Sequence, residues 1–309
     1  MTNEGSELCV AVPWGEIRGK VWGPNDGRPV LCLHGWADNC GSFNTLIPLL
    51  PEGCRYVAMD LAGHGLSSHR PPGASYTIPA YVTDVCRVVD GLHWKKFSII
   101  GHSMGGHIAA MFTALYPEMV DALVLLDVHG FVPTDPKKMS KLMRQGIDEL
   151  LQFEKKTEEK TRVYTYEKAV QRLLAANPTL SEQAVHILLE RGLTPVEGGF
   201  VFSRDLRVNS KNIMRTSLEQ CLALQSGIQA PVLVILADKG YSSTLPESSQ
   251  KKLTSAVLQG YLDRNHTVVS VPGDHHVHLN NPEVISPLIS DFLQCSRSSC
   301  QPHHLTHKL

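Results

Sequence analysis

Short hydrophobic runs recur along the chain at a spacing that indicates the strands of one sheet. Each run is four or five residues long and contains few polar side chains. This composition is typical of parallel strands that are buried on both faces. The runs lie at residues 30–33, 56–59, 97–100, 122–126, 232–236 and 267–271.

Between these runs, hydrophobic residues repeat at the spacing of an α-helix. Alternating strands and helices require crossover connections, so we predict an α/β fold with a doubly wound, mostly parallel sheet. Two segments near the N-terminus, 8–12 and 16–22, predict a hairpin at one edge of the sheet. The expected helices cover residues 42–50, 77–92, 246–258, 282–293 and the segment that begins after residue 103.

The alternation stops between residues 130 and 228, where Lys, Glu, Arg and Gln dominate. Amphipathic helical patterns recur there, at 141–153, 167–176 and 181–191, and predict a helical insertion. The predicted parts are a core of residues 1–129 and 229–294, an insertion of residues 130–228 and a flexible tail of residues 295–309.

The strand predicted at 97–100 runs directly into Gly101-His102-Ser103-Met104-Gly105, and a helical pattern follows. This order of strand, serine and helix is the context of a nucleophile elbow. A serine hydroxyl becomes a useful nucleophile when a tight turn exposes it and a base removes its proton. Gly101 and Gly105 lie two residues from Ser103, where larger side chains would collide as strand and helix approach. Ser103 is therefore the candidate nucleophile.

A candidate base follows the run at 267–271, in Gly273-Asp274-His275-His276-Val277-His278. A histidine accepts and returns a proton near neutral pH, so His275 is the first choice, with His276 and His278 as alternatives. The three histidines lack the i, i+4 helical pair and the cysteine partners that zinc sites commonly show. We expect neither a metal nor a cofactor.

Two aspartates follow predicted strands and could orient the histidine. Asp127 ends the run at 122–126, and Asp238 follows the run at 232–236. Ligands of doubly wound sheets bind beyond the carboxyl ends of the strands, and either residue keeps the chain order serine, aspartate, histidine. Both are candidates for the third member of a catalytic triad.

The turn after the run at 30–33 offers donors for an oxyanion. Gly35 lets the backbone turn, so that the amide of Trp36 can point at a developing negative charge together with the amide of Met104. We expect His34 to be a structural hydrogen-bonding residue. The glycine-rich loop 60–67 lacks the Lys-Ser/Thr of phosphate-binding loops, and we expect it to hold the oxyanion loop in place.

Together these motifs resemble the α/β-hydrolase superfamily, and most closely the vertebrate serine hydrolase-like proteins. The resemblance covers roughly residues 8–293 and rests on Leu33-His34-Gly35-Trp36, residues 60–67, the elbow and Gly273-Asp274-His275. It implies the α/β-hydrolase fold, with residues 130–228 as a helical cap. It also implies Ser103 as nucleophile, His275 as base and the amides of Trp36 and Met104 as oxyanion donors.

One departure from the resemblance concerns the acid. Relatives usually carry Gly-x-x-Asp after the seventh core strand, whereas this chain has Ala237-Asp238-Lys239-Gly240, with glycine at the position of the acid. Some members of the superfamily place the acid after the sixth strand, which is where Asp127 falls. We therefore rank Asp127 ahead of Asp238.

The nucleophile decides the expected reaction. Dehalogenases and epoxide hydrolases of the superfamily use an aspartate at the elbow, whereas a serine favours attack on an acyl carbon. We expect hydrolysis of a carboxylic ester or thioester through an acyl-enzyme on Ser103, with a small-molecule acyl substrate as the partner. The alternatives are a ligand-binding protein with weak or no turnover and a carbon–carbon bond hydrolase of the meta-cleavage type.

Charge and targeting signals add limits. The chain has 29 Lys and Arg against 30 Asp and Glu, a formal charge of −1, which argues against binding to nucleic acid or an anionic membrane. Residues 1–30 contain no long hydrophobic run, so we expect neither a secretory leader nor a membrane span, and the eight scattered cysteines indicate free thiols. We expect a cytoplasmic protein. His307-Lys308-Leu309 approximates the Ser-Lys-Leu peroxisomal signal, so the peroxisome is the alternative.

Overall fold

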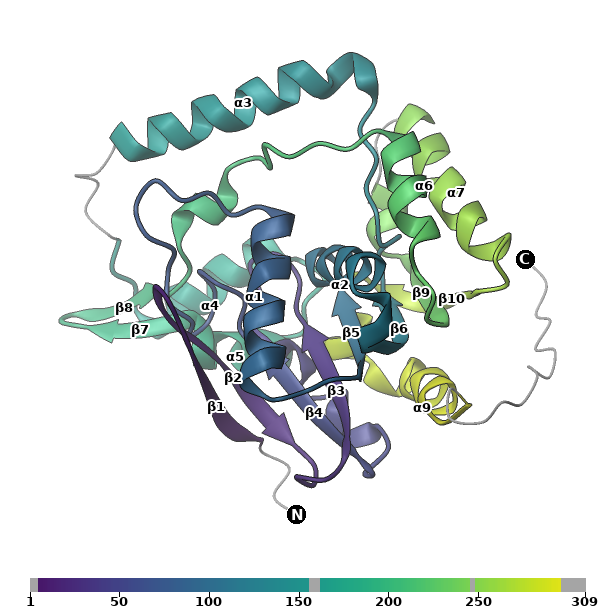
Figure 1. The fold of residues 1–309 in the computed structure, drawn as a ribbon. Coiled ribbons are helices and arrows are strands. Elements are labelled where there is room, and N and C mark those ends of the chain that lie inside the picture. Colours follow the sequence, from purple (N-terminus) through teal and green to yellow (C-terminus); the bar gives the residue numbers. More distant parts are fainter. Residues whose placement is uncertain (1–4, 156–161, 245–247, 296–309) are drawn as a thin grey trace.

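The computed structural model describes residues 5–155, 162–244 and 248–295 and centres on one mixed sheet (Figure 1). Its eight strands lie in the order β1-β2-β4-β3-β5-β6-β9-β10. β2 pairs antiparallel with both β1 and β4, and the remaining neighbours pair parallel. The strands are β1 (Ser6–Val12), β2 (Gly15–Trp22), β3 (Arg28–Leu33), β4 (Cys54–Met59), β5 (Phe97–His102), β6 (Val120–Leu126), β9 (Val232–Lys239) and β10 (Thr267–Asp274). The predicted sheet and its edge hairpin are confirmed.

Helices cover both faces of this sheet. The helices of the core are α1 (Ile78–Gly91), α2 (Met104–Leu115), α7 (Ser248–Leu262), α8 (Val277–Asn280) and α9 (Ser286–Cys295). Between β6 and β9 the chain forms α3 (Pro136–Lys155), α4 (Tyr166–Ala176), α5 (Glu182–Gly192), the hairpin β7 (Leu193–Val196) and β8 (Gly199–Phe202), and α6 (Leu218–Ser226). The predicted helices in segments 77–92, 141–153, 167–176 and 181–191 are confirmed.

Two local predictions were wrong. Residues 42–50 form no continuous helix, because Cys40–Phe43 and Ile47–Leu49 are separate 3-10 helices. Pro48 lacks the amide hydrogen that a continuous helix would need at that position. The insertion also contains a hairpin that we did not predict. The signal for it was Gly198-Gly199, which turn with φ of 84° and 149° between two apolar segments.

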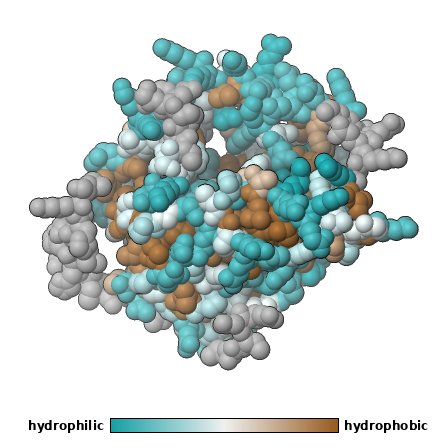
Figure 2. Space-filling model, turned by 180° about the vertical axis from the view of Figure 1, so that it is seen from behind, coloured by the Kyte–Doolittle hydropathy of each residue, from teal (hydrophilic) through white to brown (hydrophobic). Residues whose placement is uncertain are grey.

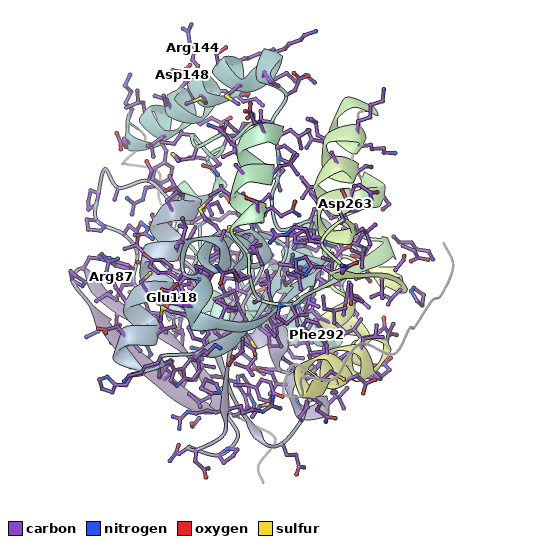
Figure 3. All side chains as sticks on the ribbon, turned by 45° about the vertical axis from the view of Figure 1, so that its right-hand side comes forward. Arg87, Glu118, Arg144, Asp148, Asp263 and Phe292 are labelled. Atoms are coloured by element: carbon purple, nitrogen blue, oxygen red, sulfur yellow. The ribbon has the colours of Figure 1, made fainter. Side chains whose placement is uncertain are left out.

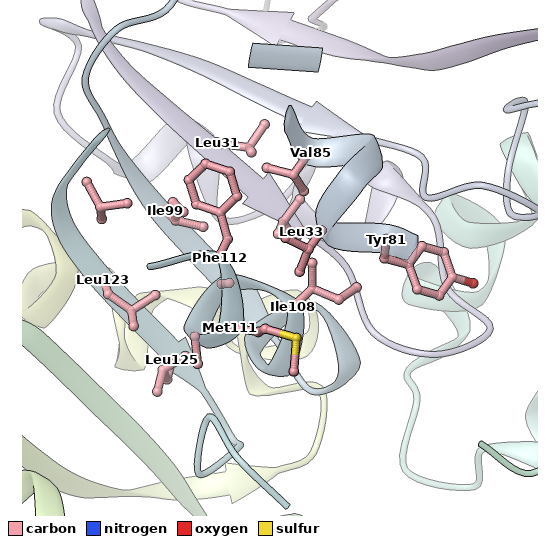
Figure 4. Packing of buried hydrophobic residues seen from close by; sticks show 14 of the residues in the cluster. Leu31, Leu33, Tyr81, Val85, Ile99, Ile108, Met111, Phe112, Leu123 and Leu125 are labelled. Atoms are coloured by element: carbon pink, nitrogen blue, oxygen red, sulfur yellow. The ribbon is translucent and has the colours of Figure 1, made fainter. Parts of the chain in front are cut away.

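Successive residues of each central strand point to opposite faces of the sheet, which explains the continuous hydrophobic runs. On one face, Leu31 and Leu33 pack with Ile99 and Phe112 (Figure 4). On the other face, the alternate residues of the same strands pack against the two 3-10 helices and α9. The core is therefore two apolar layers separated by one sheet.

The inserted segment divides into parts with different neighbours. α4 and α5 form a small apolar cluster with the β7–β8 hairpin, and Leu279 of α8 also belongs to it. α6 instead packs against α2 and α7, and its Cys221 belongs to the main core. α3 runs across the top of the molecule in Figure 1, and Gly146 is its buried residue. An open cavity of about 520 Å³ lies between the start of α3 and α6.

The surface seen in Figure 2 is largely hydrophilic, with separate hydrophobic patches and a hollow beneath its upper rim. Within the described ranges, every helix is too short or too polar to cross a bilayer. The seven cysteines in these ranges are free thiols. Cys300, residues 296–309 of the predicted tail and the sequence His307-Lys308-Leu309 lie outside the described residues.

A buried ion pair joins the insertion to the core. Arg191 near the end of α5 donates through Nε to Asp60 Oδ2 at 3.0 Å. Its Nη1 donates to Glu7 Oε1 of β1 at 2.6 Å. Asp60 directly follows β4 and is fully buried. Its two oxygens also accept hydrogen bonds from the amides of Cys40 and Leu66. A charge buried in this way needs both its cation and its hydrogen bonds.

Replacement of Arg191 by leucine is expected to lower the free energy of unfolding by about 3 kcal/mol, because it leaves the Asp60 carboxylate buried without its cation. The two backbone amides that still donate to Asp60 keep the loss near this value. Urea unfolding of the purified variant measures the effect.

The matched control is Arg144→Leu. Arg144 pairs with Asp148 on the exposed side of α3, where Figure 3 shows both residues at the edge of the molecule. Loss of an exposed pair should cost less than about 1 kcal/mol. Equal losses in the two variants would show that Arg191 contributes no more than a surface arginine.

Candidate active site

Ser103 lies at the sharp turn between β5 and α2. Its backbone adopts φ 51° and ψ −118°, which is a strained conformation for a residue with a side chain. The amide of Ser103 donates to the carbonyl of Leu126 at the end of β6, at 3.1 Å. The turn is therefore fixed from the neighbouring strand, and it presents the side chain beyond the end of the sheet.

The glycines around Ser103 have the steric role that the sequence predicted. A Cβ on Gly105 would lie 2.1 Å from the carbonyl oxygen of Leu33 in β3. A Cβ on Gly101 would lie 2.5 Å from the Cα of Gly106. Both distances are shorter than any real carbon contact, so the close approach of β3, β5 and α2 requires glycine at these positions.

His275 follows the last residue of β10 and contacts Ser103. Its Nε2 lies 2.9 Å from Ser103 Oγ, and its Nδ1 lies 2.6 Å from Asp127 Oδ2. The three side chains come from the ends of β5, β6 and β10. They form a continuous hydrogen-bonded chain from hydroxyl to imidazole to carboxylate, which is the geometry of a catalytic triad.

Asp127 is buried at the end of β6 and accepts hydrogen bonds from the backbone as well as from His275. The amide of Ala237 donates to its Oδ1 at 3.0 Å, and the amide of Tyr241 donates to its Oδ2 at 2.6 Å. These two amides hold the carboxyl group from the side of β9. A carboxylate held by two amides can orient the imidazole without moving itself.

Gly240 occupies the position where relatives usually carry the acid, and the structure gives the physical reason for glycine there. A Cβ on Gly240 would lie 2.2 Å from Asp127 Oδ2 and 2.4 Å from its carboxyl carbon. The Asp127 carboxylate therefore fills the space that a side chain at position 240 would need.

Asp238 occupies a different place. It is exposed, and its Oδ1 accepts a hydrogen bond from the amide of Gly273 at 2.9 Å. His275 Nδ1 donates to the carboxylate of Asp127 instead. Asp238 thus supports the turn that precedes His275, and the structure brings Asp127 rather than Asp238 to the histidine.

The loop that carries Trp36 is held by the loop after β4, as the sequence predicted. The amide of Leu61 donates to His34 Nε2 at 2.9 Å, and the amide of Ala37 donates to His64 Nε2 at 3.3 Å. Burial lowers the pKa of His34 and that of His64, the latter to about 3, so both rings are neutral and can accept these bonds. His34 therefore has the structural role expected of it.

Trp36 itself is half-exposed, at 52% of its surface. Its indole Nε1 donates to the carbonyl of Val208 at 2.9 Å, and the guanidinium of Arg204 lies 5.3 Å from the ring centroid. These contacts leave the indole on the surface beside the insertion. The amide of Met104 begins α2 directly after Ser103, where helix amides point outward with a partial positive charge.

The two alternative histidines do not contact Ser103. His276 Nε2 lies 3.3 Å from Asp38 Oδ2, and His278 Nε2 lies 2.6 Å from Ser42 Oγ. In the part of the chain that the structure describes, no three His, Cys, Asp or Glu side chains are grouped so as to hold a metal ion. Asp38 was not among the residues that the sequence singled out for chemistry, because nothing in its local motif marks it.

Comparisons with known proteins agree with this fold. A model of the alpha/beta hydrolase fold family matches residues 28–282. The serine hydrolase-like protein of Danio rerio is 56% identical over 297 residues, which cover 95% of this chain and 90% of that protein. Serine hydrolase-like protein 2 of Homo sapiens is 44% identical over 299 residues, which cover 94% and 95% of the two chains.

A solved structure extends the comparison to three dimensions. A hypothetical protein from Pseudomonas aeruginosa PAO1 is 31% identical and superimposes with a TM-score of 0.80, covering 93% of this chain and 97% of the other. The chain therefore belongs to the alpha/beta hydrolase family, and it is similar to the serine hydrolase-like proteins of vertebrates.

Proposed function

We propose that the protein is a serine hydrolase that cleaves carboxylic esters or thioesters through an acyl-enzyme on Ser103. The observation that carries this proposal is the chain of hydrogen bonds from Ser103 Oγ through His275 to Asp127. The names of the vertebrate relatives point to the same class of reaction.

In the first half of the reaction, Ser103 Oγ attacks the acyl carbon and His275 Nε2 takes the hydroxyl proton. The carbonyl oxygen gains negative charge, which we expect the amides of Trp36 and Met104 to stabilise. Asp127 holds the imidazolium that forms. His275 then returns the proton to the leaving alcohol or thiol, and the acyl group remains on Ser103.

In the second half, water attacks the acyl-enzyme. His275 takes one proton from the water, and the resulting tetrahedral intermediate collapses to release the acid and to restore the Ser103 hydroxyl with that proton. The same three side chains thus serve both halves. A hydroxyl nucleophile forms an ester that water can cleave in this way, which supports attack on acyl carbons rather than alkyl carbons.

The alternative of a binding protein without turnover rests on the missing Gly-x-x-Asp pattern, because a chain without the acid would have an incomplete triad. Asp127 now occupies the space at Gly240 and contacts the histidine, so that departure no longer favours the alternative. A carbon–carbon bond hydrolase would use the same three side chains. We favour an acyl substrate with a hydrocarbon chain, because exposed hydrophobic side chains lie on the oxyanion loop and on the inserted segment.

These side chains belong to the Trp36 loop, to residues 204–214 and to α3. Arg204 and Val208 contact the Trp36 ring, and the following residues run beneath α3. A Cβ on Gly146 of α3 would lie 3.0 Å from Ile213, and Glu149 bonds both the amide and the side chain of Lys211. The segment 204–214 therefore connects the oxyanion loop to the cap helix.

Several large hydrophobic side chains on these elements are exposed. The exposed fractions are 52% for Trp36, 37% for Met143, 46% for Ile147, 55% for Leu206 and 50% for Met214. Hydrophobic side chains grouped on a surface mark a binding region more often than single ones do. We propose that a hydrocarbon chain attached to the acyl carbon binds against some of these side chains.

The first prediction from this proposal separates the two aspartates. Asp127→Asn should lower kcat on p-nitrophenyl esters by about 10³-fold to 10⁴-fold, because an amide cannot stabilise the imidazolium or hold its tautomer. Asp238→Asn keeps an oxygen that accepts from the amide of Gly273, so its kcat should stay within about tenfold. Similar losses in both variants would contradict the assignment of the acid.

A second prediction moves the acid. Gly240→Ala should lower kcat at least about tenfold, because its Cβ displaces the Asp127 carboxylate. The double variant Asp127→Gly with Gly240→Asp should recover activity relative to Asp127→Gly alone, since the new carboxylate occupies nearly the same space. No gain in the double variant, with both proteins folded by circular dichroism, would show that the site requires the backbone donors of Asp127.

A third prediction concerns the hydrocarbon chain. Across p-nitrophenyl esters from acetyl to decanoyl, kcat/KM should rise by up to about fourfold per methylene. Ile147→Asp should reduce the rate for decanoyl and leave the rate for acetyl, because it places a charge in the apolar surface. Leu262→Asp, at an exposed leucine of α7, is the matched control. An unchanged chain-length profile in Ile147→Asp would contradict the assignment of this surface.

A further inference from the structure

A cluster of buried polar side chains lies behind the triad and takes no part in the mechanism above. Its members are Asp38 on the oxyanion loop, His102 at the end of β5, and His276 and His278 after the base. Their exposed fractions are 8% for Asp38, 1% for His102, 6% for His276 and 0% for His278. Polar groups buried to this extent are costly unless their contacts repay the burial.

His102 contacts the backbone of the base itself. Its Nε2 lies 2.7 Å from the carbonyl oxygen of His275. A carbonyl oxygen can only accept, so Nε2 carries the hydrogen and the bond runs from His102 to His275. Burial keeps the pKa of His102 well below its usual value, so the ring is neutral and Nε2–H is its one donor.

Asp38 and His276 form a second pair of carboxylate and imidazole next to the triad. Asp38 Oδ2 lies 3.3 Å from His276 Nε2 and 3.7 Å from His102 Nδ1. Burial disfavours the charged forms of both side chains, but the attraction between Asp38 and His276 outweighs this effect. The carboxylate raises the pKa of His276, and the imidazolium lowers the pKa of Asp38 to about 2. The two side chains therefore attract each other, and their contact joins the oxyanion loop to the segment that follows the base.

The packing around these groups leaves little freedom. The rings of His102 and His278 lie 4.0 Å apart between centroids, and those of His102 and His275 lie 4.7 Å apart. A Cβ on Gly35 would lie 2.8 Å from His102 Nδ1 and 3.1 Å from Asp38 Oδ2. Glycine at position 35 thus lets the oxyanion loop approach the nucleophile strand closely enough for the cluster to form.

The cluster connects the three loops on which the reaction depends. Asp38 lies two residues after Trp36, His102 lies one residue before Ser103, and His276 lies one residue after His275. We propose that His102, packed beside the pair of Asp38 and His276, is a positioning residue that fixes the backbone of His275 relative to Ser103 and the oxyanion loop. This inference rests on the proposed hydrolase function and deepens it.

We call the hydrogen bond from His102 to the His275 carbonyl, with the packing around it, the His102 clamp. Its effect is on the rate of the chemical step. His275 follows the end of β10, and its ring reaches Ser103 only if its backbone is held. A displacement of about 1 Å in a reacting group can cost roughly 100-fold in rate. The clamp acts before and after substrate binding alike, so its loss should change kcat and leave KM nearly unchanged.

The test replaces His102 in two ways. In His102→Gln the side-chain amide nitrogen reaches about as far as Nε2 and can still donate to the His275 carbonyl, whereas in His102→Leu no donor remains. The measured quantity is the second-order rate of labelling of Ser103 by a fluorophosphonate, together with kcat and KM for an ester. His102→Leu should label about 10-fold to 100-fold more slowly than the wild type, and His102→Gln within about fivefold of it.

His266→Leu is the matched control. His266 precedes β10, at the opposite end of that strand from His275, and its ring packs on Tyr261. His266→Leu makes the same exchange of imidazole for an isobutyl group away from the active site, so the labelling rate should not change. Two results would overturn the proposal. The first is a His102→Leu variant that is labelled as fast as the wild type, and the second is an equal loss of labelling rate in His102→Gln and His102→Leu. In both cases the hydrogen bond would have no effect on the base.

A second readout keeps the inference apart from the proposed function. The proton between His275 Nδ1 and Asp127 gives a downfield NMR signal if the ring is held in the short hydrogen bond, whether or not an ester is turned over. This signal should persist in His102→Gln and broaden or vanish in His102→Leu at matched folded content. A wild type that shows the signal but never labels would refute the hydrolase, whereas a persistent signal in His102→Leu would refute the clamp.

Discussion

The buried carboxylate of Asp127 is the contact on which the rest of the site depends. It accepts hydrogen bonds from His275, from the amide of Ala237 in β9 and from the amide of Tyr241 just beyond that strand. One side chain therefore joins the ends of β6, β9 and β10. The parallel sheet brings these ends to one edge, and the carboxylate fixes their separation, so the position of the base follows from the core.

The site is also a place of backbone strain. Ser103 and Asp127 have φ of 51° and 48°, in the left-handed region that residues with side chains seldom adopt. Each such residue costs roughly 1–3 kcal/mol, which the surrounding structure must offset. Here the offset is visible as backbone hydrogen bonds, from the amide of Ser103 to Leu126 and from the amide of Asp127 to Ile235.

Much of the fold and of the candidate site was predictable from the sequence, and the features that were not have physical reasons. Strands buried on both faces appear as unbroken apolar runs, and the steric needs of the elbow appear as Gly101 and Gly105. The position after a strand did not separate Asp127 from Asp238, because both residues follow strands, and the ranking of Asp127 rested on the glycine at position 240. The physical reason for that glycine is the short distance between Asp127 and Gly240, which follow two neighbouring strands. The clamp at His102 likewise depends on segments far apart in the chain, and no local motif records it.

The most direct measurement of the central claim is rapid acid quenching during turnover of a slowly deacylated ester, followed by mass spectrometry of the peptides. We predict that the acyl mass appears on the peptide that contains Ser103, at a rate at least equal to kcat. Turnover with that peptide unmodified, or with the acyl group on another residue, would contradict the assignment of Ser103, His275 and Asp127 as the reacting triad.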